Sequence, residues 1–191
     1  MQVVKLGGSL LRDPLLPAWL GRLAAQGAGQ TVIVPGGGPF ADAARAVQKE
    51  WRVNDVCAHN MAVLGMAQCA HLLHGLEPRL ALADSEADLR ACLDEGRAAI
   101  WLPLSLQRDA PDALTSWDVT SDSLAAWLAL RLGARSVVLV KSCPVPPQAT
   151  PDALAAAGIV DRAFPGYAAQ CARAGINCTV VTRTDIDKVL A

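Results

Sequence analysis

Short β-branched runs alternate with longer Ala- and Leu-rich segments from one end of the sequence to the other. This alternation is typical of a parallel sheet with helices packed on its faces. Strands are predicted at 2–6, 31–34, 79–83, 98–102, 136–141 and 178–182. Helices are predicted at 15–28, 40–51, 55–76, 86–95, 121–132 and 163–174. The strand runs are apolar without alternation, as in strands buried on both faces, so the predicted fold class is α/β.

The length of 191 residues suits one domain around a single core, and we predict one domain over residues 1–191. Two stretches rich in Pro, Asp, Ser and other polar residues, 105–117 and 143–150, are predicted to be surface loops. In an open parallel sheet, ligands usually bind at the loops that follow the strand ends. Ligand-binding residues are therefore expected where the predicted strands end.

The overall composition excludes some classes of function. The formal net charge is −1 and the basic residues are scattered, which argues against a nucleic-acid-binding surface. The six cysteines form no CxxC pair, so we interpret them as reduced thiols of a cytoplasmic protein. No secretory signal and no apolar run of membrane-spanning length is recognised, so no membrane association is expected. The low charged fraction, 18%, leaves apolar surface for a subunit partner.

The first predicted strand runs into a glycine pair and then a helical segment. Gly7 and Gly8 let backbone N–H groups approach an anion, and Lys5 at the strand end supplies a full positive charge beside Ser9. This arrangement predicts a phosphate-binding turn. It is not a Walker A loop, because the lysine precedes the glycines. The alternative is an ordinary tight turn with a lysine that reaches solvent.

The second predicted strand also ends in glycines, Gly36, Gly37 and Gly38, before the next helix. Three consecutive glycines lose a large conformational entropy on folding, so such a loop usually turns main-chain amides toward a ligand. The alternative is a flexible connection. Two glycine loops after two strands indicate two anionic groups that face each other.

A polar cluster opens the predicted helix at 121–132. Thr120 or Ser121 can cap this helix, and Asp122 lies in its first turn, where the helix dipole favours a carboxylate. Capping does not account for Asp118 or for the several hydroxyl side chains that lie close to it in the sequence. A carboxylate here can also hold Lys5 in place or bind Mg²⁺ through water, as phosphoryl transfer requires.

The strand predicted at 136–141 ends in Lys141 and is followed by Ser142. At the ligand-binding edge of a parallel sheet, both are candidates to contact nucleotide phosphates. The alternative is an ordinary solvated strand end.

The order of these four segments, K-x-G-G-S, V-P-G-G-G, T-S-D-S-x-A-A and a strand ending in Lys-Ser, resembles the amino acid kinase superfamily over essentially the full chain. The resemblance implies a three-layer αβα sandwich with a mainly parallel open sheet. It implies that Lys5 binds the transferring phosphate, that residues 7–9 line the ATP phosphates and that residues 36–38 face the acceptor. Asp122 matches the carboxylate that orients the catalytic lysine.

Two further stretches, 51–62 and 116–122, look like the small kinases that phosphorylate 5-(aminomethyl)-3-furanmethanol phosphate in methanofuran-type cofactor synthesis. Their acceptor is a phosphomonoester and their product a diphosphate. Isopentenyl phosphate kinases do the same chemistry with a histidine on the acceptor phosphate, which makes His59 the candidate for that role. The alternative is a hydrogen-bonded structural histidine.

The sequence departs from the superfamily at residues 158–165. Larger members carry a Gly-Met-x-x-Lys signature there, whose lysine also stabilises the transferring phosphate, and no lysine is present in this stretch. Arg162 and Lys141 are the two candidates to replace it. Asp161 is a candidate ligand of either metal or substrate.

The resemblance predicts an ATP-dependent kinase that uses ATP and Mg²⁺, with Asp118, Thr120 and Ser121 near the substrate and the metal ligands unassigned. A phosphate acceptor already carries an oxyanion, so no general base is required. A homodimer or larger homo-oligomer is expected. The alternatives are a sensor or storage protein that binds a nucleotide or anion without turnover, and a kinase for a carboxylate, carbamate or isopentenyl phosphate acceptor.

Overall fold

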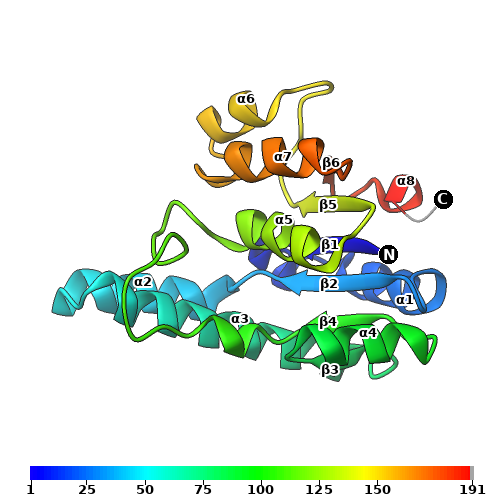
Figure 1. Cartoon of the computed structure of the whole chain (residues 1–191), viewed down its shortest axis with the longest axis horizontal. Helices are drawn as coiled ribbons and strands as arrows, with labels where there is room; N and C mark the ends of the chain where they lie inside the picture. Colours follow the sequence, from blue (N-terminus) through cyan, green and yellow to red (C-terminus); the bar gives the residue numbers. More distant parts are fainter. Residues whose placement is uncertain (190–191) are drawn as a thin grey trace.

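The computed structural model describes residues 1–189 and contains one six-stranded parallel sheet (Figure 1). The strands are β1 (Gln2–Leu6), β2 (Thr31–Pro35), β3 (Ala81–Ala83), β4 (Ala99–Trp101), β5 (Ser136–Lys141) and β6 (Asn177–Thr182). Their order across the sheet is β3-β4-β2-β1-β5-β6, and every neighbouring pair is parallel. The six predicted strands are confirmed, with ends that differ by at most two residues.

Six helices match the predicted ones: α1 (Leu16–Gln26), α2 (Gly38–Trp51), α3 (Asp55–Leu76), α4 (Glu86–Asp94), α5 (Ser121–Leu132) and α7 (Phe164–Arg173). Short elements were not predicted: α6 (Pro151–Ala156), α8 (Ile186–Val189) and 3-10 helices at Gly8–Arg12 and Pro103–Leu106. A start signal for α6 is present in the sequence. Thr150 accepts a hydrogen bond from the Ala153 N–H and a proline follows it directly, a common first turn of a helix.

Two hydrophobic cores lie on opposite faces of the sheet. On one face, Val3 and Val137 pack with buried residues of α4, α5, α6 and α7. On the other, Val4 and Val138 pack with α1 and with the C-terminal half of α3. Successive residues of a strand point to opposite faces, which is why apolar runs without alternation can fill both cores. The three-layer αβα architecture is confirmed.

The longest helix, α3, is apolar around most of its circumference. By length and composition it is the one helix among the described residues that could span a membrane. It packs against α2 and against β2 and β4, which accounts for much of that apolar character. Asn54 caps its start by accepting a hydrogen bond from the Cys57 N–H at 2.8 Å. Together α2 and the first turns of α3 project past the carboxyl ends of the strands (Figure 1).

The parallel register places several of the predicted site residues side by side. Lys5 of β1 pairs with Leu139 of β5, so Lys141, two residues farther along β5, lies at the same edge of the sheet. The glycine turns after β1 and β2 leave this edge as neighbours, since Leu6 pairs with Pro35. The carboxyl edge of β1, β2 and β5 therefore carries the groups that the sequence singled out.

Candidate active site

The two glycine turns pack against each other, backbone on backbone. The Gly36 N–H donates to the Leu6 carbonyl at 2.8 Å. A Cβ atom on Gly8 would lie 2.3 Å from the Gly38 nitrogen, and one on Gly36 would lie 2.3 Å from the Gly8 nitrogen. Real Cβ atoms do not approach so closely, so side chains at these positions would force the turns apart. The glycines thus serve the contact between the turns as well as any approach to a ligand.

Below the turns, one buried carboxylate joins two lysines from adjacent strands. Lys5 Nζ lies 2.8 Å from Asp122 Oδ1, and Lys141 Nζ lies 2.6 Å from Asp122 Oδ2. The side chains of Lys5, Asp122 and Lys141 are only 6%, 5% and 11% exposed. Three ionised groups at this depth need one another, because an unpaired buried charge is costly. The cluster carries two positive charges and one negative, a net charge that suits an anionic ligand.

Burial and charge act against each other in this cluster. Burial alone would raise the pKa of Asp122, but the positive charges of Lys5 and Lys141 outweigh it and hold that pKa below its usual value. Burial lowers the pKa of Lys141 to about 8, and repulsion from Lys5 acts in the same direction, while Asp122 opposes both. Lys141 therefore keeps most of its charge at neutral pH and loses it as the pH rises through about 8.

Asp161 caps α5 from a distant part of the chain. Its carboxylate accepts from the Thr120 N–H and the Thr120 hydroxyl, both at 2.8 Å, and from the Ser123 N–H at 3.0 Å and the Ser123 hydroxyl at 2.5 Å. The Phe164 N–H donates to it at 2.9 Å. Thr120 occupies the N-cap position that the sequence allowed for it, but its hydroxyl makes no capping hydrogen bond and donates to Asp161 instead. Asp161, a candidate metal or substrate ligand, has both oxygens engaged in this structural role.

Two adjoining cavities open around the glycine turns and the lysines. The glycine-turn cavity has a volume of about 570 Å³ and is lined by Gly8, Ser9, Gly37 and Gly38 together with residues of α2 and α3. The lysine cavity has a volume of about 960 Å³ and is lined by Lys5, Asp122 and Lys141. Arg45, Trp117 and Thr120 line both. The molecule thus offers two neighbouring compartments with a common boundary.

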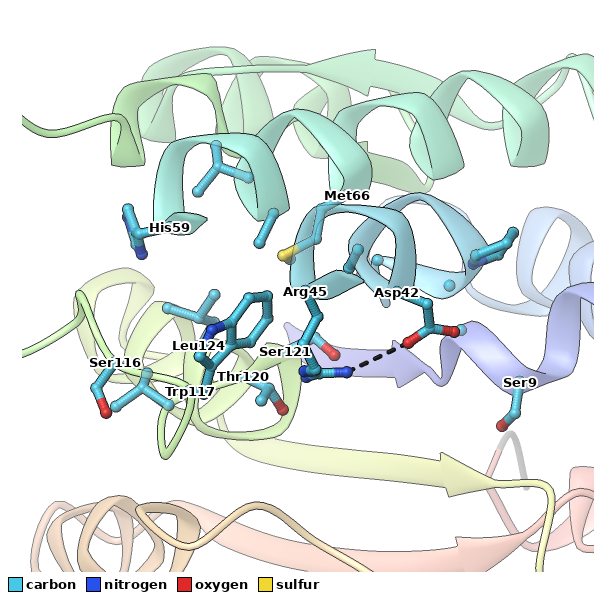
Figure 2. A pocket seen from close by; sticks show the side chains of 18 of the residues that line it. Ser9, Asp42, Arg45, His59, Met66, Ser116, Trp117, Thr120, Ser121 and Leu124 are labelled. Atoms are coloured by element: carbon cyan, nitrogen blue, oxygen red, sulfur yellow. Dashed lines mark hydrogen bonds and ion pairs between the residues drawn. The ribbon is translucent and has the colours of Figure 1, made fainter. Parts of the chain in front are cut away.

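One face of α3 forms a wall of the glycine-turn cavity. Asp55, His59, Val63 and Met66 line it and recur at the spacing of one helix face. Opposite them lie Trp117 and Leu124 (Figure 2). The wall is polar toward the start of the helix, at Asp55 and His59, and apolar beyond, at Val63 and Met66, a combination that is usual for small-molecule sites.

Trp117 is held in place by polar contacts. Its indole Nε1 donates to Gln48 Oε1 at 2.5 Å, and Gln48 Nε2 donates to Asp55 Oδ1 at 2.8 Å. The guanidinium carbon of Arg45 lies 4.1 Å from the centre of the indole ring. Arg45 and Asp55 were not among the predicted site residues. On the helix that follows the glycines, Arg45 lies one turn after Ala41, which also lines the cavity. This helical spacing is the sequence signal that could have identified Arg45 as a site residue.

His59 lines the glycine-turn cavity, at the opposite end from Ser9 in Figure 2. Its Nε2 donates to the Leu106 carbonyl at 2.8 Å, so in the neutral ring the other nitrogen, Nδ1, is an acceptor. Only the imidazolium form could offer Nδ1–H to a phosphate. The helix position that the sequence singled out therefore does face the cavity, with one ring nitrogen already engaged.

The remaining predicted residues lie at the rim of the site. Ser9 Oγ and Ser142 Oγ lie 2.8 Å apart, which joins the turn after β1 to the end of β5. Asp118 faces the lysine cavity and lies 3.6 Å from Arg162, whose side chain is 84% exposed. Of the two candidates for a second cation, Lys141 therefore lies within the buried cluster and Arg162 lies outside it.

A divalent metal would have few free protein ligands here. In the described part of the chain, no group of three His, Cys, Asp or Glu side chains could hold a metal ion. The carboxylate of Asp122 is paired with lysines and that of Asp161 with backbone and hydroxyl donors. Asp118 and Asp152 also line the lysine cavity. One or two carboxylates are enough for Mg²⁺ that arrives on a nucleotide phosphate and keeps its waters.

Comparisons with known proteins give a matching family and a relative. The family model described as the Amino acid kinase family matches residues 1–144. The [5-(aminomethyl)furan-3-yl]methyl phosphate kinase of Methanocaldococcus jannaschii is 32% identical over 144 residues, which cover 73% of this chain and 64% of that relative. The chain thus spans less than two thirds of the length of this relative.

Solved structures support the fold over the whole chain. Uridylate kinase from Archaeoglobus fulgidus has a TM-score of 0.72 at 18% identity and covers 100% of this chain and 95% of its own. UMP kinase from Ureaplasma parvum has a TM-score of 0.70 at 15% identity, with the same coverage of both chains. At such low identity the likeness shows the fold alone.

Proposed function

The chain belongs to the amino acid kinase family, and on that premise we propose that it transfers the γ-phosphoryl group of ATP to a phosphomonoester, 5-(aminomethyl)-3-furanmethanol phosphate. The observation that carries the proposal is the pair of adjoining cavities, which share a boundary at Arg45, Trp117 and Thr120. A donor in one cavity and an acceptor in the other would meet at that boundary, as direct transfer requires.

The reaction needs charge neutralisation more than covalent help. An oxygen of the acceptor phosphate forms a bond to the γ-phosphorus while the bond from that phosphorus to the β,γ-bridging oxygen breaks. ADP leaves, and the acceptor becomes a diphosphate. Because the acceptor phosphate is already an oxyanion, no proton has to be removed. Lys5 and Lys141 supply positive charge to the phosphates, and Asp122 fixes both ammonium groups.

The lysine cavity is the compartment for ATP in this scheme. Its two buried lysines face the phosphates, while Ser9 lines the glycine-turn cavity and is hydrogen-bonded to Ser142 at the end of β5. Mg²⁺ bound to the nucleotide would neutralise phosphate charge, with Asp118 or Asp152 as the carboxylates available to it. Gly8 and Gly38 line the glycine-turn cavity, and in this scheme their main-chain amides would contact the phosphates from that side.

The glycine-turn cavity suits a flat acceptor that carries a cationic group. Trp117 offers an aromatic face, and Met66 and Leu124 continue the apolar wall. Asp55 places a carboxylate on the same wall, where the neutral amide of Gln48 is its hydrogen-bond partner. The aminomethyl group named for the Methanocaldococcus relative is an ammonium at neutral pH, and Asp55 would complement it. Under this proposal His59 contacts the acceptor.

Two further expectations stay predictions. A homodimer or larger homo-oligomer would cover exposed apolar side chains such as Phe40 of α2 and Leu64, Leu72 and Leu76 of α3. A cytoplasmic location also remains a prediction.

A coupled assay for ADP release tests the proposal. MgATP is offered with 5-(aminomethyl)-3-furanmethanol phosphate, isopentenyl phosphate, acetylglutamate, aspartate or carbamate. Release with the furan phosphate above the rate without an acceptor is the expected result. Release with another acceptor would keep the kinase and reject this substrate. ATP binding without turnover across the panel would favour the sensor or storage protein.

A further inference from the structure

Arg45 stands out at the boundary between the two cavities. Among the described residues it is the one cationic side chain that lines both of them. Arg12 lines only the glycine-turn cavity, and Arg162 lines only the lysine cavity. Lys5 and Lys141 also belong to the lysine cavity alone, where they share Asp122. A phosphoryl group in transit would therefore meet Arg45 before it leaves the donor compartment completely.

The resting contacts of Arg45 leave its hydrogen-bond donors available. Its guanidinium carbon lies over the Trp117 ring, 4.1 Å from the ring centre, in a cation–π contact that uses none of its N–H bonds. Asp42 lies 3.2 Å from Arg45 Nη1 one turn earlier on α2 (Figure 2). Both side chains of this ion pair are more than half exposed, so the pair contributes little and is readily exchanged for a phosphate.

An arginine is well matched to this position. Its planar fork can bind two phosphate oxygens at once, while the ammonium of a lysine acts as a point charge. Trp117 contacts the guanidinium through its ring, and Gln48 in turn accepts a hydrogen bond from the indole N–H. The indole and the guanidinium thus contact each other at the boundary of the two cavities.

We propose that Arg45 is a phosphate ligand of the transfer reaction, which binds the acceptor phosphate and the transferring phosphoryl group between the two cavities. This inference rests on the proposed function. Asp42 holds the guanidinium when no phosphate is bound. The role differs from that of the buried lysines, because Arg45 can follow the phosphoryl group as it passes from ATP to the acceptor.

The test compares Arg45→Gln and Arg45→Lys with a matched control, Arg131→Gln. Arg131 is also stacked on a tryptophan, Trp127 at 5.0 Å, and is also paired with an acid, Glu86, but it lines neither cavity. We expect Arg45→Gln to lower kcat/KM for the acceptor by about a hundredfold to a thousandfold, as for loss of one charge-stabilising donor. Added guanidinium should restore part of that activity, which a purely structural defect would not allow. Arg45→Lys should lose about tenfold, and Arg131→Gln should resemble the wild type.

The outcomes separate the inference from the function it rests on. If the wild type turns over and Arg45→Gln stays within threefold of Arg131→Gln, the inference is rejected and the kinase remains. If the wild type releases no ADP with any acceptor, the proposed function fails. Isothermal titration with inorganic phosphate then decides about Arg45 itself. Weaker binding in Arg45→Gln alone would support Arg45 as a phosphate ligand, whereas equal binding in all variants, or no binding to the wild type, would reject it.

Discussion

Lys5 Nζ lies 2.8 Å from Asp122 Oδ1, and both side chains are almost completely buried. The second oxygen of the same carboxylate binds Lys141, so one aspartate at the start of α5 organises the ends of two parallel strands. Removing one lysine leaves a balanced pair, whereas removing the aspartate leaves two buried ammonium groups that repel each other. The cluster is therefore asymmetric, and substitutions at its members should have different consequences.

Replacing Lys5 should affect turnover more than stability. We expect Lys5→Ala to lower kcat by about a hundredfold or more, because one preorganised group that stabilises the developing charge is lost. Lys5→Met, closer in volume, should behave in the same way and keep a melting temperature near that of the wild type, since Asp122 retains Lys141. Steady-state kinetics and thermal unfolding measure both effects. Turnover like that of the wild type would remove Lys5 from the mechanism.

Asp122→Asn should lose both activity and stability. It leaves two buried positive charges without their carboxylate, and breaking a buried ion pair in this way costs about 3–5 kcal/mol in the free energy of unfolding. Urea denaturation measures this cost. Because Asp161 rather than Asp122 caps α5, such a loss would report the lysines and not a missing helix cap. An Asn variant as stable as the wild type would contradict the role of this carboxylate.

The activity should fall at alkaline pH because of Lys141. Burial, aided by Lys5, lowers the pKa of Lys141 to about 8, so the free enzyme loses this charge as the pH rises through 8. We expect kcat/KM for MgATP, which reports groups of the free enzyme, to decline over that range. Lys141→Arg keeps its charge at all accessible pH values and should remove the decline, even if its overall rate is lower. An unchanged pH profile in this variant would assign the decline to another group.

The same group predicts the opposite trend for stability. Above pH 8 the folded protein releases the Lys141 proton, while the unfolded chain keeps it up to the usual pKa of 10.5. The unfolded state then binds more protons, so the contribution of Lys141 to the free energy of unfolding rises between about pH 8 and 10.5. Activity and this part of the stability thus move in opposite directions with pH.

The fold could be predicted because each strand and long helix has a local signal. Residues 55–76 and 121–132 form helices over the predicted ranges, and each begins after a polar residue, Asn54 or Thr120. The missed elements are short. In α6 the cap Thr150 precedes only six helical residues, of which Pro151 is the first, too few for an apolar periodicity to develop.

The site could be predicted in part, for a different reason. Lys5, Asp122 and Lys141 follow from strand ends and a helix start, which the parallel register brings together. The capping of α5 by Asp161 joins residues about 40 positions apart, and no local pattern encodes that contact. The boundary formed by Arg45 and Trp117 likewise depends on how α2 packs against the loop before α5.

The cap of α5 should be a major source of stability. Asp161→Ala leaves the Thr120, Ser123 and Phe164 N–H groups without their acceptor, and we expect a loss of about 2–4 kcal/mol, more than an ordinary cap because several charge-assisted bonds are lost together. Asp118→Asn is the control, since its ion pair with Arg162 is exposed and should contribute less than about 1 kcal/mol. Equal stability of the two variants by urea denaturation would contradict the capping role.

The contact between the glycine turns predicts that Gly8→Ala destroys the site. Its Cβ would lie 2.3 Å from the Gly38 nitrogen and 2.5 Å from the Gly38 Cα, so the turn after β1 would be displaced from the turn after β2. Turnover should fall by at least about a hundredfold, because displacements of about 1 Å already have effects of that size.

Gly166→Ala is the matched control for Gly8→Ala. Gly166 lies in α7, where a Cβ would meet no atom within 4 Å, and alanine there should raise stability by up to about 1 kcal/mol. Full activity in Gly8→Ala would contradict this prediction. The turns would then separate without disturbing the cavities, and donor and acceptor would have to meet at another place than the one proposed.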